Sequence, residues 1–143
     1  MTTIDTLRSL QKRIREATGP DRELDKAIWL AIGNAPRVVP EGYTLNTGLA
    51  PRYTTDLDGL GACVALMRDQ FPGALWAVWD MEDGPGCRLL IPGKSGAYHD
   101  GVEVQTPVDK WTPPTVCAAM IDCVIAARIA VMAEEEAKEK ADA

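Results

Sequence analysis

The sequence predicts an α+β protein in which a three-stranded antiparallel sheet packs against helices. Three observations predict this class. Apolar residues recur at helical spacing in the first third of the chain, and the period changes to a β pattern rich in Trp and Val at Ala74–Met81. A long apolar segment, Val116–Ala133, follows the β region. The 143 residues are about the size of one domain, so the expected order is helix, helix, loop, helix, three strands and helix.

The first two helices are expected to form a hairpin. The first runs from about Ile4 to Ala17, because Thr3 can cap it and an apolar stripe follows. Gly19-Pro20 ends this helix, since proline cannot continue the turn. A second apolar stripe predicts the next helix between Asp21 and Gly33.

Residues 34–53 show no clear period and are interrupted by proline and glycine. Twenty irregular residues inside a compact domain are uncommon, and such segments are often functional. The segment holds charged and aromatic side chains that could bind a small molecule or nucleotide by charge and stacking: Arg37, Tyr43, Arg52 and Tyr53. An ordinary connecting loop is the alternative interpretation.

The third helix is expected to begin after Thr54 or Thr55 and to end at Pro72-Gly73. The strands are expected at Ala74–Met81, Cys87–Ile91 and Ala97–Gln105. Because the turns at Asp83–Gly86 and Pro92–Gly96 are short, the strands must form an antiparallel meander. The first strand is apolar on both faces, which predicts a fairly central position in the sheet.

The last helix is expected to open at Thr112 and to be apolar on most sides from Val116 to Ala133. Asp122 and Arg128 within that stretch favour a helix buried in the protein's own core over a membrane span, because each charge costs roughly 2.5–3.5 kcal/mol near a bilayer centre. Residues 134–143 are strongly charged and are expected to fray into solvent.

The chain is therefore interpreted as one domain, residues 1–133, followed by a charged tail at 134–143. Within the domain, residues 1–33 form the helical hairpin, 34–53 the long loop and 54–133 an αβββα core. No internal repeat and no linker divides it.

The net charge of −6 is distributed unevenly along the chain. Residues 1–72 hold nine basic and nine acidic side chains, whereas residues 73–143 hold six basic and twelve acidic ones. A phosphate-binding surface needs the opposite balance, so direct nucleic-acid binding is not expected. The αβββα order resembles that of double-stranded-RNA-binding domains, but the basic start of the final helix is missing.

Few residues suggest catalysis. Asp80, Glu82 and Asp83 cluster after the first strand and could ligate a hard cation, with His99 as a general base, but a solvated acidic turn is the simpler interpretation. We assign no catalytic residue, metal or cofactor. Gly93-Lys94-Ser95 lacks the spacing of a P-loop, which leaves Lys94 as a contact point at a hairpin tip.

Trp76 and Trp79 lie three apart on the first strand, so their side chains leave opposite faces of the sheet. One of them can serve the core. If Trp76 or Trp79 is exposed beside Tyr98, that face becomes an interaction surface; the alternative is that all of them pack in the core.

Four cysteines carry no zinc spacing: Cys63, Cys87, Cys117 and Cys123. No signal peptide is visible at Met1–Asp5, so we expect reduced, buried thiols and a cytoplasmic protein.

Two segments carry a resemblance. Ala17–Asp25 leads into the second helix, and Pro51–Asp58 opens the third; Thr106-Pro107 and the end of the apolar helix near Ala126–Arg128 follow. Together they resemble the small phage proteins grouped as the phage αβα-sandwich domain family. The resemblance implies a phage or prophage origin and a bacterial cytoplasm, and it brings no catalytic residue. The chain departs from it by an insertion around Val38–Leu49 and by the acidic tail.

Three hypotheses for function follow. The first is a non-enzymatic interaction protein of phage origin that inhibits a host or anti-phage defence protein through an acidic surface. The second is a small-molecule or nucleotide binder that uses the residues of the 34–53 segment. The third is a metal-dependent hydrolase built on the acidic turn and His99.

Overall fold

The computed structural model describes residues 2–33, 50–55, 57–107 and 111–142. Its elements confirm the α+β class and the predicted order. They are α1 (Ile4–Glu16), α2 (Arg22–Ile32), α3 (Leu57–Gln70), β1 (Leu75–Met81), β2 (Gly84–Ile91), β3 (Val102–Gln105) and α4 (Val116–Asp142). A short 3₁₀ turn, η2 (Tyr98–Asp100), precedes β3.

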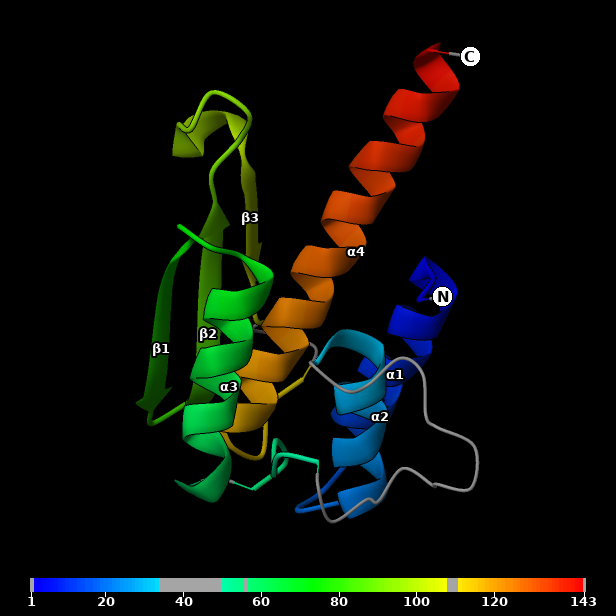
Figure 1. Cartoon of the computed structure of the whole chain (residues 1–143). Coiled ribbons are helices and arrows are strands. Elements are labelled where there is room, and N and C mark those ends of the chain that lie inside the picture. The colour runs from blue at the N-terminus through cyan, green and yellow to red at the C-terminus, as the bar shows by residue number, and fades with distance from the viewer. Residues whose placement is uncertain (1, 34–49, 56, 108–110, 143) are drawn as a thin grey trace, which may run out of the picture.

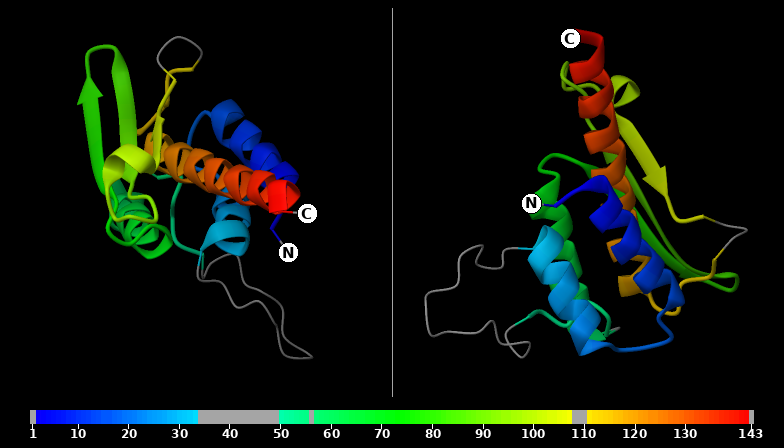
Figure 2. Two further views of the ribbon diagram at one scale, coloured as in Figure 1. Left: turned by 90° about the horizontal axis from the view of Figure 1, so that it is seen from above. Right: turned by 90° about the vertical axis from the view of Figure 1, so that its right-hand side faces the viewer.

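The elements stack in layers on one side of the sheet (Figure 1). The sheet forms the first layer, α3 and α4 lie against it, and α1 and α2 pack on the far side of α4. Seen from above, α4 runs through the middle of the molecule between the sheet and the N-terminal helices (Figure 2). Because α4 touches both outer layers, it is the element around which the core is built.

The sheet has the order β1-β2-β3, with both pairs antiparallel. The predicted meander is therefore confirmed, but the expectation that the first strand is central is wrong, because β1 lies at an edge. Trp76 and Val78 pack against the core, while Leu75 and Met81 on the other face are 52% and 65% exposed. Both faces of β1 carry apolar side chains, but only one of these faces is buried, and the other is exposed to solvent.

The turn between β1 and β2 also differs from the prediction. Met81 pairs with Gly84, so Glu82 and Asp83 form a two-residue turn and β2 begins at Gly84 rather than Cys87. Gly84 has a φ of +115°, which suits glycine. Pro85 is tolerated in the strand because β3 pairs only with the later part of β2, so the missing N–H costs no bond to β3.

The core is formed where the first half of α4 meets its neighbours. From Cys117 to Ala127 nearly every side chain is buried. Leu7, Leu10 and Ile14 of α1 and Leu89 of β2 complete the contact from both sides. By length and hydropathy α4 could also cross a membrane, but half of its apolar window is buried inside the protein, as in a core helix.

One ion pair is buried in this core. Asp122 of α4 is 1% exposed, and its two carboxylate oxygens accept hydrogen bonds from Nε of Arg15 at 2.9 Å and from Nη2 at 3.3 Å. The Arg15 guanidinium also lies over the ring of Trp111, 5.7 Å from its centroid. Burial raises the pKa of Asp122, and Arg15 opposes that rise. The ion pair therefore fixes α1 against α4, although removing its charged groups from water costs free energy.

The ends of α4 differ from the expected ones. Its first turn is capped by Thr115, whose Oγ1 accepts from the N–H of Ala118 at 3.0 Å, rather than by Thr112. At the other end the helix does not stop near Ala133 but continues in register to Asp142. The segment expected to fray is therefore helical for about two and a half further turns, and it projects from the body of the protein (Figure 1).

The two most specific segments of the family resemblance meet in the structure. Asp25 of α2 is fully buried and accepts hydrogen bonds from Arg22 and from the backbone N–H of Thr54, both at 2.8 Å. The N–H of Asp21 donates to the Thr54 hydroxyl, and Arg22 also donates to the carbonyl of Ala50. These residues join α2 to the chain that leads into α3, so they serve the fold.

Candidate partner-binding site

The acidic turn and the single histidine lie far apart. Asp80, Glu82 and Asp83 are exposed at the β1–β2 turn, whereas His99 is exposed on η2 at the other end of β2 (Figure 1). Eight residues of β2 separate the two ends, or roughly 25 Å at the usual rise of a strand. Within the described residues, no group of three His, Cys, Asp or Glu side chains is placed to hold a metal ion.

The predicted ligand-binding segment is only partly described. Arg37 and Tyr43 lie outside the described residues. Arg52 is exposed, but Tyr53 is 4% exposed and belongs to the core. Burial raises the pKa of Tyr53 to about 12, and the nearby Cys63 and acidic groups add to the rise. The Tyr53 ring is therefore occupied by packing and is not free to stack on a ligand.

The four cysteines are all buried, as expected, and they lie in two pairs. The Cys63 thiol of α3 donates to the carbonyl of Tyr53 at 3.7 Å, and the Cys123 thiol of α4 donates to the carbonyl of Val104 at 3.8 Å. The neighbouring thiol of Cys117, together with burial, raises the pKa of Cys63 well above the ordinary value, and the neighbouring thiol of Cys87, together with burial, does the same for Cys123. Thiols that stay protonated and covered are poor nucleophiles, so these cysteines act as small core residues.

The aromatic residues of β1 divide between the faces of the sheet, as their spacing predicts. Trp76 is partly buried against the core, and the Trp79 indole lies on Gly86 of the neighbouring strand, on the outer face. Tyr98 is 40% exposed, and its hydroxyl donates to the carbonyl of Gly73 at 2.9 Å. Trp76 therefore belongs mainly to the core, and the aromatic residues do not gather on one surface.

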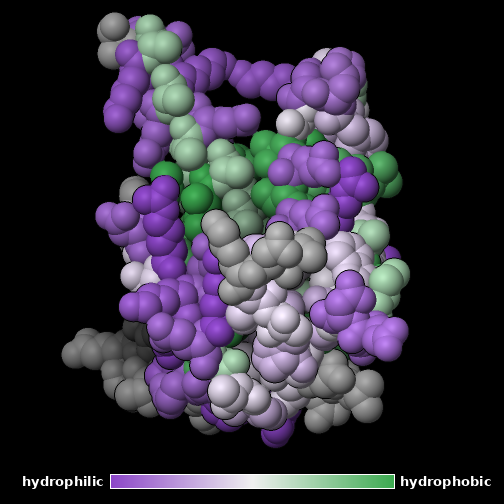
Figure 3. Space-filling view, turned by 180° about the vertical axis from the view of Figure 1, so that it is seen from behind, coloured by the Kyte–Doolittle hydropathy of each residue, from purple (hydrophilic) through white to green (hydrophobic). Residues whose placement is uncertain are grey.

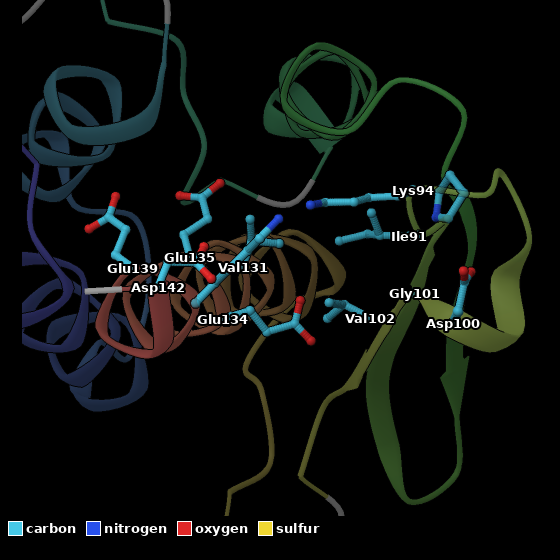
Figure 4. A pocket seen from close by; sticks show the side chains of 13 residues that line it. Ile91, Lys94, Asp100, Gly101, Val102, Val131, Glu134, Glu135, Glu139 and Asp142 are labelled. Atoms are coloured by element: carbon cyan, nitrogen blue, oxygen red, sulfur yellow. The ribbon is translucent and has the colours of Figure 1, made fainter.

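The structure places Lys94 at the edge of a cleft of about 750 Å³. One wall is the connection between β2 and β3, which carries Lys94 and Asp100, and the other wall is the last part of α4 (Figure 4). The partly buried side chains of Ile91, Val102 and Val131 lie between the two walls. We refer to this cleft as the α4 groove.

The wall contributed by α4 was missed by the sequence analysis. Its groove-lining residues follow helical spacing and are mostly acidic: Val131, Glu134, Glu135, Lys138, Glu139 and Asp142. The signal was present in the sequence, because positions three and four apart share a helix face. It was overlooked because residues 134–143 were expected to be a frayed tail.

The electrostatics of the α4 groove are dominated by carboxylates. Five acidic and two basic side chains line it, and the two basic ones, Lys94 and Lys138, approach each other across the opening. The neighbouring ammonium group of Lys94 lowers the pKa of Lys138, because two positive charges close together repel each other. Asp100 is held on its own side of the groove by the hydroxyl of Ser95, at 2.6 Å. The α4 carboxylates make no ion pair across the groove among the described residues.

Comparison with known proteins gives no further guide. No family model, no curated protein and no solved structure matches the chain. The resemblance to the phage family therefore stays a prediction.

Proposed function

We propose that the protein is a non-enzymatic interaction protein of phage or prophage origin, which inhibits a host or anti-phage defence protein by binding it through an acidic surface. The observation that supports this proposal is the segregation of charge. Four carboxylates lie along one face of α4, beyond the folded core: Glu134, Glu135, Glu139 and Asp142.

Within the part of the chain that the structure describes, these carboxylates form no ion pair with another element. The last turns of α4 are exposed, and the two ion pairs that fix α1 and α2 lie elsewhere, at Asp122 and Asp25. A surface with an excess of negative charge, held on a helix, attracts a partner of opposite charge and aligns it during encounter. A protein that binds nucleic acid through basic side chains carries the opposite charge. The acidic face of α4 can compete with nucleic acid for those basic side chains.

The phage origin is supported by the resembling segments. Arg22 and Thr54, which lie in those segments, donate hydrogen bonds to the buried Asp25, so these residues stabilise the fold. A family defined by such residues can keep one scaffold while its exposed surfaces differ from member to member, as expected of proteins that bind different targets.

The proposal is tested by affinity capture. The tagged protein, immobilised and exposed to a bacterial lysate at low salt, should retain a partner in stoichiometric amount, and raising the salt to about 0.5 M should release it because exposed charges are screened. A variant in which Glu134, Glu135, Glu139 and Asp142 are replaced by Gln or Asn should lose that partner.

A matched control carries the same kind of change at the other end of the molecule. Replacing Asp80, Glu82 and Asp83 of the β1–β2 turn by their amides should leave capture unchanged, because these residues lie at the far end of the sheet. If no stoichiometric partner is retained at any salt concentration, or if a partner is bound equally by both variants, the acidic surface of α4 is not what binds.

A further inference from the structure

The α4 groove has a shape that an acidic patch alone would lack. Seen from behind, a hydrophobic band lies in the hollow between the projecting part of α4 and the sheet, and hydrophilic atoms span the opening above it (Figure 3). The groove is lined at its base by Ile91, Val102 and Val131. An apolar base below a charged rim is the arrangement that binds the apolar side of an amphipathic segment.

The length and direction of the groove suit a helix. Its α4 wall extends from Val131 to Asp142, about 16 Å at 1.5 Å per residue, which is three helical turns. Along this length the groove-lining face of α4 repeats every three to four residues, so a second helix packed alongside would meet side chains at its own period. The described elements leave this face uncovered, since α1 packs on α4 from the opposite side.

The charge of the rim specifies the sign of the occupant. Five carboxylates against two ammonium groups favour a cation, and phosphate or carboxylate groups would be repelled by the α4 wall. Arg or Lys side chains on the partner would meet Glu135 and Glu139 on the wall. They would also pair with the α4 carboxylates, which make no ion pair among the described residues.

We propose that the α4 groove is the docking site for a basic amphipathic helix of the partner protein. The apolar side of that helix packs on Ile91, Val102 and Val131, and its basic residues pair with Glu134, Glu135 and Glu139. This inference rests on the proposed function and specifies the surface and the class of segment that it binds.

The test uses model peptides. A fluorescently labelled helix of about 15 residues, with leucine on one side and lysine on the other, should bind with a micromolar dissociation constant, measured by anisotropy. A peptide of the same charge with serine in place of leucine should bind at least about tenfold more weakly, because it has no apolar side for the base of the groove.

Two neighbouring glutamates of α4 supply a matched pair of variants. Glu135 lines the groove, whereas Glu136 lies on the opposite face, beside α1. Both are exposed, so Glu135→Lys and Glu136→Lys make the same change in charge and in helix propensity. We expect Glu135→Lys to weaken the leucine–lysine peptide about tenfold or more and Glu136→Lys to weaken it less than about threefold.

Methyl NMR locates the contact. Titration with the leucine–lysine peptide should shift the signals of Ile91, Val102 and Val131 and leave those of Leu75 and Met81, on the outer face of the sheet, unchanged. Equal losses in the two glutamate variants, or shifts confined to the outer face, would mean that the peptide is attracted by net charge or binds elsewhere, and would overturn the inference.

The two proposals can fail separately. If a lysate partner is captured by the unaltered protein and bound equally by the Glu135→Lys and Glu136→Lys variants, the interaction function stands and the groove is not its site. If the leucine–lysine peptide discriminates between these variants but the lysate yields no partner, the groove stands and the proposed function fails.

Discussion

The two halves of α4 share one helical backbone and have opposite surroundings. From Cys117 to Ala127 the helix is enclosed by the sheet, α3 and α1, whereas from Glu134 to Asp142 its side chains are exposed. The first half is stabilised by the burial of its apolar side chains. The second half relies on the high helix propensity of Ala, Glu and Lys and on a Glu–Lys spacing of four residues on the face away from the groove, between Glu136 and Lys140.

This difference separates residues that the fold needs from residues that it does not. A change in the first half alters the core and costs stability, whereas a change in the second half alters a surface. Acidic residues kept on one face without a structural role are free to serve binding. The following substitutions test whether the two halves are independent in this way.

The largest effect is expected at the buried ion pair. Arg15→Ala leaves Asp122 with a buried charge and without its guanidinium partner, so we expect a loss of about 3–5 kcal/mol in the free energy of unfolding, measured by urea denaturation. Asp122→Asn removes the charge and should cost less. The double variant should recover part of the loss, since no charge is then buried unpaired.

The pH dependence of the Arg15→Ala variant checks the cause. Burial already raises the pKa of Asp122, and removing Arg15 raises it further. A carboxyl whose pKa is higher in the folded state binds its proton preferentially there, so the folded protein is favoured at low pH and loses that advantage as pH rises through the folded pKa. The destabilisation should therefore be smaller near about pH 4.5 than near about pH 7. A loss independent of pH would point to packing against Trp111 instead.

Truncation of an apolar side chain compares the two halves directly. Ile125→Ala in the first half opens a cavity at a fully buried position and should cost about 2–5 kcal/mol. Val131→Ala, six residues later at a partly buried position, should cost about 1 kcal/mol or less. Thermal and urea denaturation measure both. Similar losses would show that the core extends further along α4 than the burial of these residues indicates.

The sequence was sufficient to predict the fold where local signals are strong. Thr3 and Asp21 cap α1 and α2 as their types predict, and the antiparallel order follows from short turns. It was insufficient for β1, because an apolar outer face looks the same in a central strand and in an uncovered edge strand. The position of the β1–β2 turn was missed because Pro85 suggests a turn, although a strand accepts it where no neighbour needs its N–H.

The candidate site was less predictable for a physical reason. Lys94 was singled out from its place in a turn, but its partners in the groove come from α4, about 40 residues further along the chain. A charged segment at the end of a helix has the same composition whether it frays or continues, so periodicity alone could not place it. Tyr53 was predicted as a contact and packs in the core, and Trp76 is partly buried against it, because aromatic residues serve cores and surfaces equally well.

The smallest effect on stability is expected from removing the second half of the helix. A chain ending at Ala133 loses the exposed residues 134–143 and keeps the buried part of α4, so its free energy of unfolding should change by about 1 kcal/mol or less. The same truncation removes most of the acidic wall of the α4 groove, so binding of the leucine–lysine peptide should be lost. Stability and binding would then be separated within one helix. A truncated chain that unfolds readily would instead show that the distal turns support the core, and the acidic residues would need no function beyond that support.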